Sequence, residues 1–188
     1  AFLNSNIVKN VLLICADAHS KKIDKNLVPV IGDGISCIII NKKKNITKFD
    51  YGVDGANNEV LKIDSKTKRL SMNGMKVFEF ATKRVPETFE KILKKVNHKI
   101  DFYCFHQPNK TIHDHLIKKL NIDFKKTIRT FDYGNTSSAS IPIALSKNFP
   151  NKLIKNKIFL FCGFGAGLSW STVVTKIHKA SISKVHLL

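Results

Sequence analysis

Four short apolar runs, separated by segments with helical periodicity, limit the folds open to this chain. The runs NVLLICAD (10–17), DGISCIIIN (33–41), IDFYCF (100–105) and KIFLFC (157–162) have the length and apolar content of buried strands. Between the second and third runs, residues 74–97 place apolar side chains on one stripe with the helical period. Strands that alternate with helices in this way predict an α/β fold.

The other elements rest on weaker signals. Pro86 falls inside the helical pattern and could kink or divide that helix. The remaining prediction is a helix at about 109–120, an extended segment at 126–132, a helix from about Thr136 to Phe149, and a hairpin of strands 157–162 and 168–177 around GFGAG.

The basic charge of the chain restricts its partners. Lys and Arg number 32 against 14 Asp and Glu, which gives a formal net charge of +18. One explanation is an anionic partner, whether nucleic acid, the phosphates of CoA or an acidic carrier protein. The other is a solvated surface, since the lysines are spread evenly and no nucleic-acid-binding motif accompanies them. We expect no nucleic-acid partner. We also expect no membrane partner, because no apolar run approaches the roughly 18 residues that cross a bilayer.

The four cysteines argue for a reducing compartment. Cys15, Cys37, Cys104 and Cys162 each lie in an apolar run, and no C-x-x-C pair exists. This pattern predicts reduced core residues of a cytoplasmic protein, not a disulfide framework or a zinc site.

Two glycine clusters invite a dinucleotide-binding interpretation that their context excludes. A Rossmann loop needs a following helix to hold the pyrophosphate. IGDGISC leads into a strand, and GFGAGLSW is followed by the β-branched WSTVVT, so we reject NAD or FAD binding. Gly163, Gly165 and Gly167 therefore either form a tight turn or let backbone N–H groups approach a ligand.

The stretch FHQPNKTIHDH holds three histidines in unequal contexts. His113 and His115 are two residues apart and should point to different helix faces, whereas a helical zinc pair is spaced by four. Pro108 favours a helix start, which separates His106 from the other two, so we expect no metal site. His106 itself ends a buried strand, where α/β folds present reactive side chains. Asn135, at a helix entrance, is either a cap or an amide donor.

Three motifs together resemble one known family. HQPN (106–109), YGNTSSASIP (133–142) and GFGAGLSW (163–170) occur in the order and spacing typical of β-ketoacyl-acyl-carrier-protein synthase III. Upstream segments are similar to the successive elements of the family, so the resemblance covers nearly the whole chain. It implies a thiolase-like five-layered α/β/α/β/α fold. Residues 1–70 would end the N-terminal half and connect the two, and residues 71–188 would form the C-terminal half.

The resemblance also implies roles for individual residues. His106 and Asn135 would stabilise the charge that develops on a malonyl thioester oxygen, and the backbone N–H of Gly165 would help to form an oxyanion hole. The residues implied to line the CoA or pantetheine tunnel are Gly74, Phe78, Pro108 and Asn109. The residues implied to dock an acidic carrier protein are Lys110, Lys118 and Lys119.

The nucleophilic cysteine of the family has no counterpart in this sequence. The resemblance places it upstream of KNVLLICAD, before Ala1, and none of the four cysteines has the required context. We therefore expect the C-terminal part of a longer protein, with a pseudoenzyme as the alternative. Such a part should expose apolar surface.

The function that the resemblance implies is decarboxylative condensation of an acyl-CoA starter with malonyl-acyl carrier protein, which initiates fatty-acid synthesis. The alternatives are a related acyltransferase of specialised metabolism and a non-catalytic homologue that binds carrier protein. We expect a homodimer and no cofactor, with coenzyme A and phosphopantetheine as carriers of the substrates.

Overall fold

A mixed five-stranded sheet lies at the centre of the computed structural model, which describes residues 3, 7–23, 27–41 and 47–187. In spatial order the strands are β3 (Thr47–Val53), β9 (Ser169–Ile182), β8 (Lys152–Gly165), β6 (Phe102–Phe105) and β7 (Thr127–Ile128). β6 is parallel to both of its neighbours, whereas β9 is antiparallel to β8 and β3. At the carboxyl edge of the parallel pair, β6 ends at Phe105, opposite Cys162, and β8 continues to Gly165.

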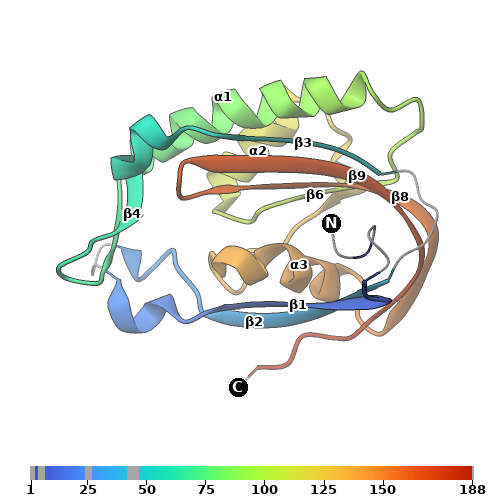
Figure 1. The fold of residues 1–188 in the computed structure, drawn as a ribbon, viewed down its shortest axis with the longest axis horizontal. Helices are drawn as coiled ribbons and strands as arrows, with labels where there is room; N and C mark the ends of the chain where they lie inside the picture. Colours follow the sequence, from blue (N-terminus) through green and yellow to red (C-terminus); the bar gives the residue numbers. More distant parts are fainter. Residues whose placement is uncertain (1–2, 4–6, 24–26, 42–46, 188) are drawn as a thin grey trace.

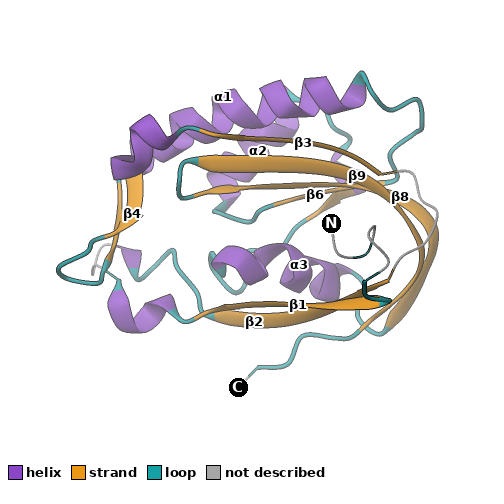
Figure 2. Ribbon diagram, viewed as in Figure 1, coloured by secondary structure: helices purple, strands orange, loops and turns teal. Residues whose placement is uncertain are grey.

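Helices cover both faces of this sheet, and a second sheet lies beyond one of them (Figure 1). α1 (Gly74–Leu93) and α2 (Lys110–Lys119) lie on one face, and α3 (Ser140–Asn148) lies on the other. The antiparallel pair β1 (Asn10–Asp17) and β2 (Gly34–Asn41) packs against the far side of α3. The order of layers is thus helix, sheet, helix, sheet, and the predicted α/β class is confirmed (Figure 2).

Short elements complete the described chain. A small hairpin of β4 (Leu61–Ile63) and β5 (Leu70–Met72) precedes α1. The 3-10 helices are η1 (His19–Lys22), η3 (Gly55–Val60), η4 (Phe124–Lys126) and η5 (Ser137–Ala139). β3 lies within residues 1–70, which we assigned to the end of the first half and the connecting strands, and it pairs with β9 in the large sheet.

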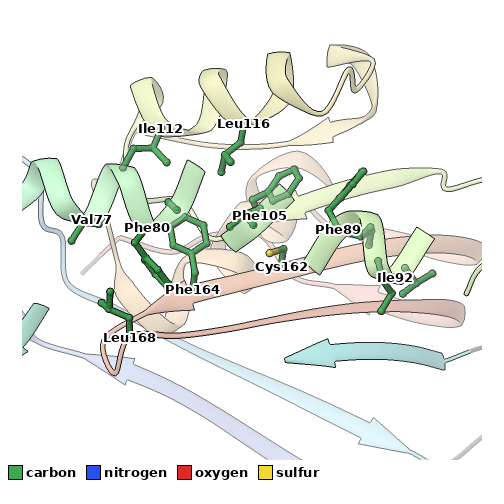
Figure 3. Close-up of a cluster of buried hydrophobic side chains, with 14 of the residues drawn as sticks. Val77, Phe80, Phe89, Ile92, Phe105, Ile112, Leu116, Cys162, Phe164 and Leu168 are labelled. Atoms are coloured by element: carbon green, nitrogen blue, oxygen red, sulfur yellow. The ribbon is translucent and has the colours of Figure 1, made fainter. Parts of the chain in front are cut away.

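The predicted apolar stripe of α1 forms the main core. Asn73 caps the helix by accepting the N–H of Lys76 at 3.1 Å. Figure 3 shows side chains of α1 beside those of β6 and β8; buried positions on the helix are Val77, Phe80, Ala81, Val85, Phe89 and Ile92. Pro86 does not divide the helix, which is continuous over 20 residues. A smaller cluster on the α3 face of the sheet contains Cys104, Ile128, Ala144, Ile154 and Phe159.

The outer face of the β1–β2 pair is apolar and uncovered in the described structure. Ile14 is 57% exposed and Ile39 is 72% exposed, because alternate residues of each strand point away from α3. The prediction of exposed apolar surface is confirmed for these strands. Cys37 lies on the same outer face and is exposed, so its assignment to the core was wrong, whereas Cys104 and Cys162 are buried. Among the described residues, no helix is long and apolar enough to span a membrane.

Candidate functional site

His106 is held at the carboxyl edge of the parallel strands. Its backbone N–H donates to the carbonyl oxygen of Cys162, with an N···O distance of 2.7 Å, so the pairing of β6 with β8 continues to this residue. Its ring stands edge-on to the Phe164 ring, with centroids 5.2 Å apart and an interplanar angle of 85°. The sequence prediction that His106 ends a buried strand is confirmed.

One ring nitrogen of His106 is engaged and the other is free within the described structure. The hydroxyl oxygen of Ser140, the first residue of α3, lies 2.7 Å from Nδ1. No described residue hydrogen-bonds Nε2. Burial in the first place, and the proximity of His113 in the second, lower the pKa of His106 to about 4. The imidazole is therefore neutral at neutral pH and carries a single N–H.

Asn135 lies in the segment that leads into η5 and α3. Its side-chain oxygen accepts the N–H of Ser137 at 2.9 Å, which turns the amide group so that the nitrogen faces away from that turn. No described residue accepts a hydrogen bond from this nitrogen. The two interpretations left open by the sequence are thus compatible, since the oxygen of Asn135 forms the turn and its NH₂ group is free to donate.

The backbone of Asn135 is fixed from both sides by the segment before β2. Its N–H donates to the Val30 carbonyl at 2.8 Å, and its own carbonyl accepts the N–H of Gly32 at 3.0 Å. A Cβ atom at Gly32 would lie 1.9 Å from the Tyr133 carbonyl oxygen, and Gly134 has a φ of +65°. These glycines therefore permit two chain segments to approach closely, which is the structural reason for IGDG where no dinucleotide loop exists.

Gly165 ends β8, on the strand that carries Phe164. A Cβ atom at Gly163 or Gly165 would meet no atom within 4 Å, and neither residue has a positive φ. The turn itself is formed by Gly167, whose φ is +135°. The fold of the described residues thus requires glycine at 167 but not at 163 or 165, and a role of the latter two in binding a ligand stays a prediction.

The residues predicted to line a pantetheine tunnel begin two neighbouring helices. Phe78 of α1 contacts His115 of α2, with ring centroids 5.2 Å apart, and one turn further along both helices Lys119 reaches Thr82. Because the second contact lies one turn towards the C-terminus of each helix, α1 and α2 run parallel. Gly74 is the first residue of α1, and Asn109 is the N-cap of α2, so both lie at the same end.

That end is the carboxyl edge at which His106 lies, because α2 starts directly after β6. Gly74 is exposed with open space around it, whereas Pro108 is buried. The Asn109 side chain accepts the N–H of Ile112 at 2.9 Å. The roles of these residues in binding a ligand stay predictions.

Comparison with known proteins shows which proteins the chain resembles. Residues 94–177 match the family described as 3-oxoacyl-[acyl-carrier-protein (ACP)] synthase III C terminal. The β-ketoacyl-[acyl-carrier-protein] synthase III of Trichodesmium erythraeum (strain IMS101) is 34% identical, over 92% of this chain and 60% of that protein. The protein of that name from Trichormus variabilis (strain ATCC 29413 / PCC 7937) is 35% identical, with the same two coverages. Over nearly all of its length, the chain is similar to β-ketoacyl-[acyl-carrier-protein] synthases III.

A solved structure of a synthase III supports the fold. The crystal structure of 3-oxoacyl-[acyl-carrier-protein] synthase III from Aquifex aeolicus VF5 matches with a TM-score of 0.85 and 29% identity, over 94% of this chain and 60% of that one. The predicted thiolase-like fold is confirmed, and the described residues supply four successive layers of it. The chain spans about 60% of the length of the curated synthase III relatives that it matches.

The three lysines predicted to dock a carrier protein differ in their surroundings. Lys110 is exposed at the start of α2 and lines a polar pocket of about 330 Å³ together with Arg129 and Lys147. Lys118 is exposed near the end of the same helix. The Lys119 ammonium instead donates to the backbone carbonyl of Thr82, at 2.8 Å. The structure leaves Lys110 and Lys118 with the freer side chains.

Sequence reasoning missed a buried polar group directly behind His106. Gln107 is 2% exposed; its side-chain oxygen accepts the N–H of Thr130 at 3.1 Å, and its nitrogen donates to the carbonyl of Phe105. His113 is fully buried, with Nε2 3.5 Å from the Gln107 nitrogen. The apolar neighbours of His113 along α2, such as Ile117, already marked this face as buried. The prediction that His113 and His115 occupy different faces is confirmed, since His115 is exposed.

The four cysteines differ in their surroundings. All four lie within described residues. Burial raises the pKa of the Cys104 thiol, and it raises that of Cys162 to about 12 although a hydrogen bond from Thr172 acts in the opposite direction. Cys15 and Cys37 belong to β1 and β2, which form the second sheet. The position of the family's nucleophile upstream of Ala1 remains a prediction, as does the expectation of no metal or cofactor. The described residues contain no group of three His, Cys, Asp or Glu that could hold a metal ion.

Proposed function

We propose that this chain supplies the decarboxylation machinery of a synthase that condenses an acyl-CoA starter with malonyl-acyl carrier protein. The observation that carries the proposal is that His106 and Asn135 are each held through one side-chain atom by residues 137–140. Ser140 contacts Nδ1 of the histidine, and the N–H of Ser137 occupies the oxygen of the asparagine. Each side chain then has one nitrogen free to donate to the same oxyanion.

The chemistry would begin with transfer of the acyl group from CoA to a cysteine thiolate, which forms an enzyme thioester and releases CoA. Malonyl-carrier protein then binds, and the bond between its methylene carbon and its carboxylate breaks to release carbon dioxide. The electron pair of that bond forms an enolate, whose oxygen is stabilised by His106 Nε2–H and the Asn135 amide. The enolate carbon attacks the acyl thioester, and the cysteine thiolate leaves.

The other predicted residues fit positions around this reaction. The N–H of Gly165 would stabilise the tetrahedral oxyanion formed on the acyl group, together with a second N–H from the nucleophilic cysteine. The pantetheine arm would pass between the starts of α1 and α2, along Gly74, Phe78, Pro108 and Asn109. The acidic carrier protein would dock on the exposed Lys110 and Lys118, since steering requires only nearby positive charge. We propose a homodimer for the intact synthase.

The test is a comparison of two half-reactions in the full-length protein. His106→Ala should slow decarboxylation of malonyl-carrier protein by about 10²–10³, the usual effect of losing one oxyanion donor. Acylation from radiolabelled acyl-CoA should remain within a few-fold of wild type. His98→Ala, at an exposed position, is the control. Equal loss of both half-reactions would refute the assigned role of His106. Carrier-protein binding by a wild-type protein that turns over neither substrate would favour the non-catalytic homologue.

A further inference from the structure

Ser140 occupies a buried position between the two parts of the candidate site. It is 2% exposed and opens α3, five residues after Asn135. Its hydroxyl oxygen lies 2.7 Å from Nδ1 of His106 and 3.4 Å from the backbone nitrogen of Gln107. Among the described residues, these two nitrogens are its only hydrogen-bond partners.

The chemistry of these partners assigns the direction of each hydrogen bond. A backbone N–H can only donate, so the Ser140 oxygen accepts from Gln107, over a long distance. The hydroxyl has one proton of its own, and Nδ1 of His106 is the one atom among its described partners that can accept it. A ring nitrogen that accepts carries no proton. The single proton of the neutral imidazole then resides on Nε2.

The opposite tautomer is unfavourable at this position. With the ring proton on Nδ1, two N–H groups would point at one hydroxyl oxygen, and the hydroxyl proton would have no acceptor among the described residues. A buried donor without a partner costs roughly 1–3 kcal/mol.

We propose that Ser140 is a positioning residue that keeps the His106 proton on Nε2, the nitrogen that faces the reacting oxygen. This inference rests on the proposed function and deepens it. Ser140 does not touch substrate; it determines which nitrogen of His106 can donate. Asn135 lies on the same short segment as Ser140. One stretch of chain therefore orients both proposed donors: Asn135 through its own turn with Ser137, and His106 through the hydroxyl group of Ser140.

The first test reads the tautomer directly in the wild-type, full-length protein. Nitrogen-15 labelling of histidine, with multiple-bond proton–nitrogen correlation, distinguishes protonated from unprotonated ring nitrogens, and His106→Ala assigns the signal. We expect His106 to show an unprotonated Nδ1 and a protonated Nε2. A proton on Nδ1 in the wild type would overturn the proposal, and this measurement needs no variant of Ser140.

The second test uses three serine variants. Ser140→Ala should populate both tautomers of His106 and slow malonyl decarboxylation by about tenfold, the equivalent of one hydrogen bond, while acylation is unchanged. Ser140→Thr, which keeps the hydroxyl, should restore the wild-type tautomer. Ser146→Ala, in the same helix, is the control. An Nε2–H tautomer and a normal rate in Ser140→Ala would reject the role of Ser140. If instead His106→Ala itself retained decarboxylation, the proposed function would fail, and the tautomer spectra would still decide the role of Ser140.

Discussion

Lys119 donates its ammonium group to the backbone carbonyl of Thr82, which is the carbonyl that Pro86 leaves without a helical partner. In an α-helix the N–H of residue 86 would bond to the carbonyl of residue 82, but proline has no N–H. The 2.8 Å contact from α2 fills that place. This explains how α1 passes through Pro86 without a break, and it gives Lys119 a structural role distinct from that of the exposed Lys118.

A double-mutant cycle tests this relationship. Lys119→Met should lower the free energy of unfolding by about 1–2 kcal/mol, because it leaves the Thr82 carbonyl unpaired. In a Pro86→Ala background the helix supplies its own N–H, so the same lysine substitution should cost much less. Urea unfolding of the full-length protein provides both values, with Lys118→Met as the exposed control. If Lys119→Met lowered the free energy of unfolding equally in both backgrounds, the contribution of Lys119 would not depend on Pro86, and this relationship would be refuted.

Gly165 and Gly32 should respond in opposite ways to a methyl group. Gly165→Ala keeps the backbone N–H and meets open space in the described structure, so its unfolding midpoint should stay near wild type. Acylation should fall, because the added methyl group would enter the space that the acyl thioester is proposed to occupy. Gly32→Ala collides with the Tyr133 carbonyl and should lose roughly 1–3 kcal/mol of stability. Thermal unfolding and acylation rates measured on both variants check the contrast. If Gly165→Ala lowered the unfolding temperature but left the acylation rate unchanged, the role of Gly165 would be purely structural.

The partly buried His106 and the fully buried His113 should make the folded protein sensitive to acid at pH values above those at which carboxylates titrate. Burial lowers the pKa of both His106 and His113 from 6.5 to about 4. The unfolded chain therefore binds protons between those values while the folded protein does not. Their contribution to stability is complete above pH 6.5 and is lost as the pH falls towards about 4, by at most about 1.4 kcal/mol per pH unit for each histidine.

His113→Leu should remove one of these two contributions. The decline in the free energy of unfolding between pH 6.5 and pH 5 should become shallower in this variant, because Leu binds no proton in either state. His115→Leu, two residues away on the exposed face, should keep the wild-type slope. Urea titrations across this range measure the difference, and identical slopes in all three proteins would show that His113 is accessible to protons.

Local periodicity was sufficient to predict the elements on which the site is built. The stripe of α1, the buried run that became β6 and the Pro-containing start of α2 all depend on neighbours within a few turns or pleats. The extents of strands were predicted less well. β8 and β9 each run for 14 residues, beyond the predicted bounds, because a strand continues as long as its partner does. β7, predicted as an extended segment at 126–132, is only two residues long.

The contacts that orient the site were beyond the reach of the sequence. Ser140 and His106 are 34 residues apart, and Lys119 and Thr82 are 37 apart, so no periodic pattern connects them. The spacing of the histidines does not reveal that His113 is interior, although its position among buried residues of α2 does. A buried polar side chain needs hydrogen-bond partners, and these partners are distant in the sequence and meet only in the folded protein.

The paired hydrogen bonds between Asn135 and residues 30 and 32 have a consequence for exchanging parts between relatives. A chimaera that transplants the YGNTS segment alone would place Asn135 beside the backbone of another protein. The backbone N–H and carbonyl of Asn135 would then no longer align with the groups that residues 30 and 32 supply here. The natural unit of exchange is therefore discontinuous, and it comprises residues 30–34 together with residues 133–140.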